Sequence, residues 1–414
     1  MADGEIRTGK VPGLKKHILL WVGTALLIVG IVLTVLSKGK PLDLLNPLSS
    51  SQKVTKVPEA MRVVGFLPTW MIGKTKTYGS EIDQLVFSSV GVSEDGSLIW
   101  DVQAKKLNSD DYINLKNNIT AAGGKNILGI ELFDDKGIDT LIASDSAKQN
   151  LYNEVKDVVE AGNFDGVNVD FEYMGNPTRI LDDDFMSFLD GAKVAGWKDV
   201  SVDIFANTIV KGNKDSLDSL LSKVDSAIIM AYDFHRPSST IAGPVAPIGA
   251  EAGVRSISEI TQKIVDFGLE KQKVIMAYPL YGYEWETDTN LENSVTRAAG
   301  YGATVFYKDG IGFTGVNWDD LAQSPWVAWQ EKAQRSRVVT QKVGKKYKKV
   351  TQYYTVDQWH QAYFENEESL GIKVQAAKQA QLGGIGFWAL GYEGKTSDLI
   401  KNLKTKLQSP PTPL

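Results

Sequence analysis

The stretch Phe164–Tyr173, which reads FDGVNVDFEY, decides the fold. Successive side chains of a β-strand point to opposite faces. One face of this stretch therefore carries Asn168, Asp170 and Glu172, and the other face carries apolar side chains. The apolar face can pack against helices, so we expect the polar face to point into the interior of a barrel. The two carboxyl groups then lie at the carboxyl end of the strand, where barrel active sites are built.

The spacing of the two acidic residues has an electrostatic consequence. Asp170 and Glu172 are close neighbours on one face, and both burial and a like charge raise the pKa of a carboxyl group. One of the pair can therefore hold a proton near neutrality. Glu172 is nearer the mouth and is the better proton donor, as a glycosidase requires. The alternative is a structural polar network, because such networks also perturb pKa values.

Short apolar runs alternate with amphipathic helical patterns on both sides of this stretch. Eight strands separated by helices favour an α/β fold of the (β/α)8 (TIM) barrel type. The expected strands are Arg62–Leu67, Gln84–Val92, Asn126–Glu131, Gly166–Tyr173, Val200–Ala206, Ala227–Tyr232, Val274–Tyr278 and Gly384–Ala389. The expected helices are Ala147–Ala161, Asp183–Ala195, Ser216–Val224, Ser256–Phe267 and Ser369–Gln381. We assign residues 61–404 to this domain and residues 405–414 to a tail.

The strand–helix rhythm breaks from about Glu286 to Phe364, which predicts a small α+β insertion after the seventh strand. Within it, Arg337–Val343 and Tyr347–Tyr354 flank Gly344-Lys345-Lys346 and predict a β-hairpin. The hairpin is basic, with Arg335, Arg337, Lys342, Lys345, Lys346, Lys348 and Lys349. It could contact an anionic wall polymer or lipid headgroups. The alternative is an ordinary solvated hairpin face.

Composition excludes several classes of protein. The chain has 414 residues and no cysteine, so disulfides, cysteine-ligated metal sites and a thiol nucleophile are excluded. With three histidines a histidine-rich metal site is not expected. The net charge of −5 argues against nucleic acid as a partner.

The N-terminal region predicts a membrane anchor. Residues 18–36, ILLWVGTALLIVGIVLTVL, carry no charge and are long enough to cross a bilayer core. Basic residues precede the stretch, which favours a cytoplasmic segment at residues 1–17 and an extracellular catalytic domain after a linker at residues 37–60. A cleaved signal peptide and a soluble helix are the alternatives. We therefore expect a single-pass protein of the cell membrane.

Four motifs resemble those of glycoside hydrolase family 18, the chitinase-like family. Asp165, Asp170 and Glu172, with Asn168 between them, resemble its D-G-x-D-x-D-x-E signature. Met230-Ala231-Tyr232-Asp233 resembles its M-x-Y-D motif, and Tyr278-Pro279-Leu280-Tyr281-Gly282 resembles its P-x-Y-G motif. Gly383-Gly384-Ile385-Gly386-Phe387-Trp388 resembles its G-G-x-x-x-W motif. The four matches occur in order on the expected strands, over roughly Met61 to Lys404.

The resemblance implies hydrolysis of β-1,4 bonds next to N-acetylglucosamine, with the acetamido group of the substrate as nucleophile. It also implies that the reaction needs no metal and no organic cofactor. Glu172 would protonate the leaving oxygen, and Asp170 would orient the acetamido group. Tyr232 would hydrogen-bond the acetamido carbonyl as charge develops. Further substrate contacts are expected from Asp233, Trp388, Asn168, Tyr281 and Glu131.

Three departures bear on the substrate. Asn168 replaces the usual middle Asp, as in the bacterial branch that trims spore and cell-wall peptidoglycan. The third strand has Gly129-Ile130-Glu131-Leu132 in place of S-x-G-G, and Phe66 replaces a common Tyr. Asn168, together with the expected membrane tether next to a wall polymer, favours peptidoglycan over a chitin-type glycan. The alternative from a different class is a non-catalytic, lectin-like glycan-binding protein on the same fold.

Overall fold

The computed structural model describes residues 60–251, 253–297, 302–344 and 346–409. The expected cytoplasmic segment, the expected anchor at residues 18–36 and all but the last residue of the expected linker lie outside these ranges. Within the ranges, no helix has both the length and the apolarity needed to cross a membrane.

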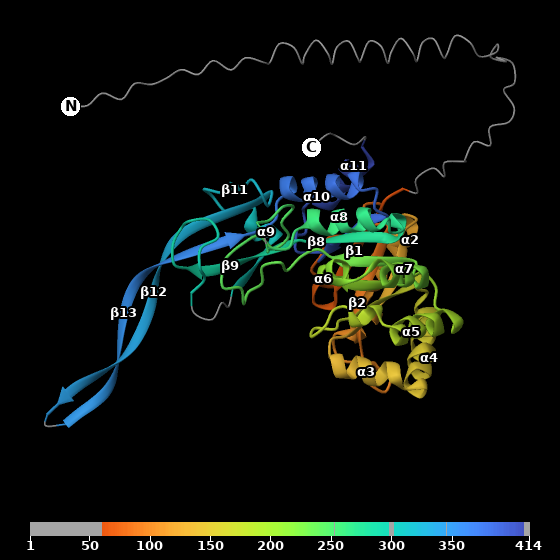
Figure 1. The fold of residues 1–414 in the computed structure, drawn as a ribbon, viewed down its shortest axis with the longest axis horizontal. Coiled ribbons are helices and arrows are strands. Elements are labelled where there is room, and N and C mark those ends of the chain that lie inside the picture. The colour runs from red at the N-terminus through yellow and green to blue at the C-terminus, as the bar shows by residue number, and fades with distance from the viewer. Residues whose placement is uncertain (1–59, 252, 298–301, 345, 410–414) are drawn as a thin grey trace, which may run out of the picture. The chain divides into compact units, whose positions relative to one another are not determined.

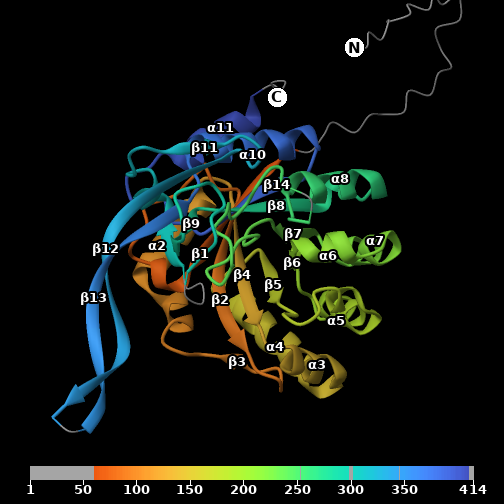
Figure 2. The same ribbon diagram turned by 60° about the vertical axis from the view of Figure 1, so that its left-hand side comes forward.

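Eight parallel strands form a closed barrel (Figures 1 and 2). Their spatial order is β1-β2-β4-β5-β6-β7-β8-β14, and β1 closes the barrel by pairing with both β2 and β14. The strands are β1 (Arg62–Pro68), β2 (Gln84–Val92), β4 (Lys125–Leu132), β5 (Gly166–Phe171), β6 (Val200–Phe205), β7 (Ser226–Met230), β8 (Val274–Pro279) and β14 (Gly384–Trp388). The predicted (β/α)8 barrel is confirmed, and each expected strand agrees with an observed one to within two residues at either end.

Helices surround the barrel. They are α2 (Asp110–Ala121), α3 (Asp135–Ala143), α4 (Asp145–Gly162), α5 (Asp183–Val194), α6 (Ala206–Lys211), α7 (Lys214–Lys223), α8 (Ile257–Phe267), α10 (Glu367–Gln379) and α11 (Leu399–Gln408). The helical patterns noted in the sequence correspond to α4, α5, α7, α8 and α10. The short strand β3 (Leu98–Ile99) pairs antiparallel with the end of β2.

The alternation within β5 sets the two sides of the barrel wall. Val167, Val169 and Phe171 are buried in the large core between strands and helices, and the Phe171 ring stacks on Phe188 of α5 at 5.8 Å. A separate apolar cluster fills part of the lumen with Val64, Phe66, Val86, Ile127, Ile228, Ile275 and Ala277. The polar side chains of β5 therefore share the lumen with this cluster.

The ends of α8 illustrate how local sequence terminates a helix. The Ser256 hydroxyl accepts a hydrogen bond from the backbone N–H of Glu259, which satisfies one of the free donors of the first turn. Gly268 ends the helix at φ +61°, a left-handed conformation that glycine adopts without a steric penalty. The α8 side chains of Ile257, Ile260 and Ile264 are buried, and their spacing places them on one face of the helix.

The insertion differs from the sequence expectation in extent and composition. It forms a five-stranded sheet in the order β10-β9-β13-β12-β11, with β9 (Tyr281–Thr287), β10 (Ala303–Phe306), β11 (Asn317–Asp319), β12 (Ser324–Val343) and β13 (Lys346–Tyr363). It begins at Tyr281 rather than at about Glu286, and its described helix, α9 (Tyr307–Gly310), is a single turn. The hairpin strands are also far longer than expected, because polar Gln, Thr and Ser positions on a two-sided exposed ribbon hide the period-two pattern.

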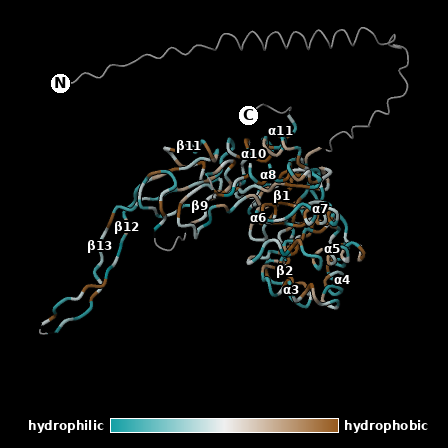
Figure 3. Tube along the Cα trace, in the orientation of Figure 1, coloured by the Kyte–Doolittle hydropathy of each residue, from teal (hydrophilic) through white to brown (hydrophobic). Residues whose placement is uncertain are grey.

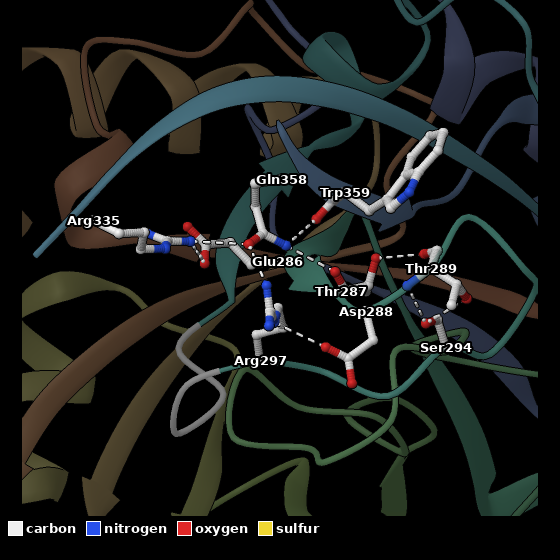
Figure 4. A network of polar contacts seen from close by, with 9 residues as sticks. All are labelled: Glu286, Thr287, Asp288, Thr289, Ser294, Arg297, Arg335, Gln358 and Trp359. Atoms are coloured by element: carbon white, nitrogen blue, oxygen red, sulfur yellow. Dashed lines mark hydrogen bonds and ion pairs between the residues drawn. The ribbon is translucent and has the colours of Figure 1, made fainter. Parts of the chain in front are cut away.

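A polar network ties the base of the hairpin to β9 (Figure 4). Arg335 and Arg297 both donate to Oε1 of Gln358, at 3.0 and 3.2 Å. The Nε2 atom of Gln358 donates to the carbonyl oxygen of Thr287 at 2.7 Å, and Arg335 also forms an ion pair with Glu286. Beyond this network β12 and β13 continue as a two-stranded ribbon (Figure 1). Hydrophilic and hydrophobic residues alternate repeatedly along both strands of this ribbon (Figure 3).

A buried ion pair joins α10 to the segment before it. Nζ of Lys373 lies 2.8 Å from Oε2 of Glu365, and the two side chains are 0% and 1% exposed. The Ser369 hydroxyl donates to the same carboxylate oxygen at 2.5 Å. Burial raises the pKa of Glu365 even though Lys373 opposes the shift. Burial therefore disfavours the charged form of Glu365 more than Lys373 favours it. Without Lys373 the carboxylate would be buried with no cation beside it.

We predict that Lys373→Met destabilises the protein by about 3–5 kcal/mol, because the substitution leaves Glu365 buried without a cation. Adding Glu365→Gln should recover most of the loss, since it removes the unpaired charge. Urea unfolding of the parent, the single variant and the double variant measures both effects. A loss below about 1 kcal/mol in Lys373→Met would contradict this account of the pair.

Candidate active site

Acidic side chains from three neighbouring strands meet at the carboxyl ends of the barrel strands. Glu131 lies on β4, Asp170 on β5 and Asp203 on β6, and Glu172 follows directly after β5 (Figure 2). Glu131 pairs in register with Asp170. The backbone N–H of Glu172 donates to the carbonyl oxygen of Leu132 at 3.0 Å, which holds the chain in place after the strand ends.

These residues line a cavity of about 450 Å³. Seven of the eight residues singled out in the sequence lie on its wall, namely Glu131, Asp170, Glu172, Tyr232, Asp233, Tyr281 and Trp388. The wall also includes Trp70, Phe133, Met174, Asp203, Phe205, Met230, Arg236, Tyr283, Thr304 and Tyr392. The cavity thus combines several carboxyl groups with tyrosine hydroxyls and apolar rings, the composition of a small-ligand site.

Asn168 does not line the cavity, although a direct substrate contact was expected from it. Its side chain is 2% exposed, and Nδ2 donates to Oγ of Ser201 at 3.1 Å and to Oδ1 of Asp203 at 2.8 Å. Both of its amide protons are therefore used within the lumen. Asn168 supports the site from below and holds the Asp203 carboxyl.

Burial and mutual repulsion raise the proton affinity of the lumen carboxyls. Burial, followed by the nearby Asp203, Glu172 and Glu131, raises the pKa of Asp170 well above its usual value. One carboxylate oxygen of Asp170 has no hydrogen-bond partner among the described residues. Burial also raises the pKa of Asp203 to about 8, against the lowering effect of its hydrogen bond from Asn168. These two groups cannot both be ionised near neutral pH without a large electrostatic cost.

Glu172 is partly exposed, unlike the buried Asp170 and Asp203. Burial raises its pKa to about 7, Asp233 and Glu131 add to the rise, and Arg236 opposes it. A carboxyl group with this pKa is populated in both protonation states near neutrality. It can therefore donate and later accept a proton at the cavity wall, which is the requirement for general acid–base chemistry.

Another part of the cavity wall is formed by Tyr232, Asp233, Tyr281 and Tyr283. The hydroxyls of Tyr281 and Tyr283 donate to Oδ1 of Asp233 at 2.6 and 2.9 Å. Asp233 has φ of +58°, a left-handed conformation that is uncommon for a residue with a side chain. The ring of Tyr232 meets that of Tyr281 edge-on at 6.2 Å, and burial raises the pKa of Tyr232 well above 10, so its hydroxyl stays protonated. The hydroxyls of Tyr281 and Tyr283 are used on Asp233, whereas the Tyr232 hydroxyl can donate to a ligand.

Trp388 supplies the apolar side of the cavity at the end of β14. Its ring lies 6.0 Å from that of Phe66 and 6.3 Å from that of Trp70, measured between centroids. The carbonyl oxygen of Trp388 accepts a hydrogen bond from Leu280 N–H at 2.7 Å, which links β14 to the start of the insertion. The planes of these rings are inclined to that of Trp388 by 54° and 70°, and together they give the cavity an apolar aromatic side.

Glu131 has a partner across the strands, because the hydroxyl of Ser89 on β2 donates to its Oε2 atom. Its carboxylate lies close enough to raise the pKa of both Asp170 and Glu172. The structure thus brings Glu131 to the cavity as an additional carboxyl group.

Sequence reasoning missed Asp203, Arg236 and Tyr283. Asp203 obeys the same alternation that revealed Asp170, since Val202 and Ile204 on either side of it are buried in the outer core. Tyr283 lies two residues after Tyr281, on the same face of β9. Arg236 follows Asp233 by three residues, but nothing in a loop sequence shows which side chains turn towards a cavity.

The described residues, with gaps at residues 252, 298–301 and 345, contain no group of three or more His, Cys, Asp or Glu side chains that could hold a metal ion.

Comparisons with known proteins assign the chain to a family. Residues 62–393 match glycosyl hydrolases family 18, and the chain belongs to this family. It is 25% identical over 275 residues to YdhD of Bacillus subtilis, which bears the name of a sporulation-specific glycosylase, and the match covers 62% of this chain and 54% of YdhD. It is 25% identical over 334 residues to mouse chitotriosidase-1, covering 74% of this chain and 67% of that one. The chain spans about half the length of the first curated relatives that it matches.

Solved structures share the fold at lower identity. The spore cortex-lytic enzyme SleL of Bacillus megaterium has a TM-score of 0.61 at 16% identity, covering 85% of this chain and 74% of SleL. A Cycas revoluta chitinase in complex with allosamidin has a TM-score of 0.67 at 16% identity, covering 84% of this chain and all of that one.

The raised pKa of Glu172 predicts that this carboxyl destabilises the folded protein at alkaline pH. Between about pH 4.5 and 7 the unfolded chain loses this proton while the folded protein keeps it. Folding then takes up a proton, so stability falls as pH rises through this window and stays low above it. Glu172→Gln removes the effect, because the amide does not titrate.

We therefore expect the unfolding free energy of Glu172→Gln relative to the parent to rise between about pH 5 and about pH 9, by up to roughly 3 kcal/mol. Urea unfolding at the two pH values measures this difference. The exposed Glu160→Gln on α4 is the control and should show no such trend. An equal offset at both pH values in Glu172→Gln would contradict the raised pKa.

Proposed function

We propose that the protein is an exported, membrane-anchored glycosidase that hydrolyses β-1,4 bonds of an N-acetylglucosamine-containing glycan. We favour peptidoglycan over a chitin-type polymer. The observation that carries the proposal is the Glu172 carboxyl on the cavity wall, with its pKa raised to about 7 beside the buried Asp170. Family membership supports the reaction class, because the acid of the family's signature corresponds to Glu172.

The proposed reaction is substrate-assisted and retains the configuration of the sugar. Protonated Glu172 donates its proton to the glycosidic oxygen as that bond breaks, and the carbonyl oxygen of the substrate's acetamido group attacks the anomeric carbon. Water later opens the oxazolinium intermediate and gives its proton to Glu172. The acid is thereby restored for the next cycle.

Asp170 and Tyr232 act on the acetamido group. The unpartnered oxygen of Asp170 accepts the acetamido N–H and stabilises the positive charge that develops on the ring. The protonated Tyr232 hydroxyl donates to the acetamido oxygen, and Trp388 carries the apolar face of the sugar. Asn168 holds the Asp203 carboxyl in place, and Asp203 sets the charge balance around Asp170.

The preference for peptidoglycan has three supports. Asn168 stands in the signature where the peptidoglycan-trimming branch of the family usually has it. The similar proteins include YdhD, named for sporulation, and SleL, named as a spore cortex-lytic enzyme. A tethered enzyme on the outer face of a membrane would also lie next to the wall polymer.

We predict that Glu172→Gln lowers hydrolysis by at least about 100-fold, the usual contribution of a general acid. Residues 56–414 of the parent and of Glu172→Gln are incubated with N-acetylglucosamine oligomers and with purified peptidoglycan, and the products are identified by mass. Glu160→Gln controls for the loss of one surface carboxylate. Binding without cleavage by the parent would reject the catalytic proposal and favour a lectin-like protein.

The anchor is tested separately. The full chain should sediment with the membrane fraction and resist extraction by high salt, whereas residues 56–414 should remain in the supernatant, because only the full chain contains the apolar stretch at residues 18–36. Protease added outside intact cells should degrade the catalytic domain. Protection from that protease would reverse the proposed topology.

A further inference from the structure

A second cavity adjoins the candidate active site. It has a volume of about 710 Å³ and is formed by the segments that follow β5, β6 and β7. Met174, Phe205, Asp233 and Arg236 line both cavities, so the two lie next to each other at the carboxyl ends of the strands. A polymer bound across the first cavity can therefore extend into the second.

The second cavity is lined by cations. Lys211, Arg236 and Arg255 lie on its wall, and Asp233 is the only acidic residue among its lining side chains. The Asp233 carboxylate already accepts the hydroxyls of Tyr281 and Tyr283. An excess of positive charge is notable in a chain with a net charge of −5, and it favours an anionic ligand.

Two of these cations have donors available. Lys211, at the end of α6, has no hydrogen-bond or ion-pair partner among the described residues. Arg236 uses Nε on the carbonyl oxygen of Asp233 at 3.3 Å, and its two terminal nitrogens have no partner in the described part of the chain. Arg255 is held in place by Glu259 at 2.6 Å and by Asn207 at 3.0 Å.

The other polar groups of the cavity are neutral. Burial lowers the pKa of His235, and its Nδ1 atom lies 2.8 Å from the carbonyl oxygen of Pro244. Asn207, Ser238 and Ser239 add uncharged hydrogen-bonding groups to the wall. Such groups suit an amide-containing substituent, whereas the lysine and arginine side chains suit a carboxylate.

We propose that this second cavity binds a carboxylate-bearing substituent of the glycan, namely the lactyl or stem-peptide group of a muramic residue next to the sugar held over Trp388. The inference rests on the proposed function and deepens it, because it makes the anionic substituent a determinant of substrate choice. A polymer of N-acetylglucosamine alone is uncharged and would leave Lys211 without a counter-charge.

Arg236 couples the second cavity to the candidate acid. Its positive charge opposes the rise in the pKa of Glu172. A carboxylate bound at Arg236 neutralises that charge, so Glu172 holds its proton more firmly when the substituent is in place. Binding of the correct substrate therefore favours the proton-donating form of Glu172.

Lys211 provides the test, because it lies in the second cavity and not on the wall of the first. Kcat/KM is measured for peptide-bearing peptidoglycan fragments and for N-acetylglucosamine oligomers. We expect Lys211→Gln to lower the value for the fragments roughly tenfold, with a larger loss in Lys211→Glu, because one charge-assisted contact is removed or reversed. The value for the oligomers should stay within about twofold of the parent. The exposed Lys156→Gln on α4 is the matched control.

Binding measurements separate this inference from the proposed function. Peptide-bearing disaccharide fragments, the same fragments with amidated carboxyls, and polyglycerol phosphate are titrated into the parent and into Lys211→Gln. We expect the parent to prefer the free carboxyl form and Lys211→Gln to lose that preference, whether or not the parent cleaves either substrate. Equal affinity of the parent for free and amidated fragments would overturn the inference, and stronger binding of polyglycerol phosphate would reassign the cavity to phosphate. Absence of cleavage by the parent with the carboxyl preference intact would reject the hydrolase proposal alone.

Discussion

The candidate site depends on the crowding of carboxyl groups in a lumen that is too small and too apolar to solvate them. Asp170 and Asp203 are almost fully buried, and Glu131 and Glu172 lie beside them. Because like charges in a desolvated space repel strongly, protons stay on part of the group at a pH where isolated acids would be ionised. The apolar cluster below and the aromatic core outside keep the acids in this environment. The packing of the barrel is therefore the reason why carboxyl groups on the cavity wall keep protons near neutral pH.

The insertion takes part in the same arrangement. Its first strand, β9, carries Tyr281 and Tyr283, whose hydroxyls hold Asp233 after β7. The same strand pairs with β13 and thereby supports the long hairpin. One strand thus joins the barrel mouth to the added sheet. The geometry of the acids in the barrel and the placement of the inserted strands are therefore linked through Asp233.

The sequence predicted the barrel and most of the candidate site because both follow from short-range periodicity. Alternation in β5 placed Asp170 and Glu172 on the lumen side, and the same rule would have placed Asp203. Asp203 is the only acidic residue of β6, whereas Asp170 and Glu172 form an alternating pair, so the β6 sequence is a weaker signal of a polar lumen face. The length of the hairpin strands could not be predicted from the sequence. Both faces of the ribbon are exposed, so neither face requires a regular alternation of apolar and polar residues. The Lys373–Glu365 pair was equally hidden, because sequence does not show that two charged side chains are both buried.

The hairpin gives the molecule an uneven distribution of charge. From Lys332 to Val356 the sequence has eight basic residues and no acidic one, although the whole chain is net negative. Tyr347, near the turn, is 71% exposed, and the ribbon extends away from the barrel (Figure 1). Positive charge is therefore concentrated on the ribbon. A polyanion would attract this part of the protein before any contact forms, and added salt would weaken the attraction by shortening the range of the field.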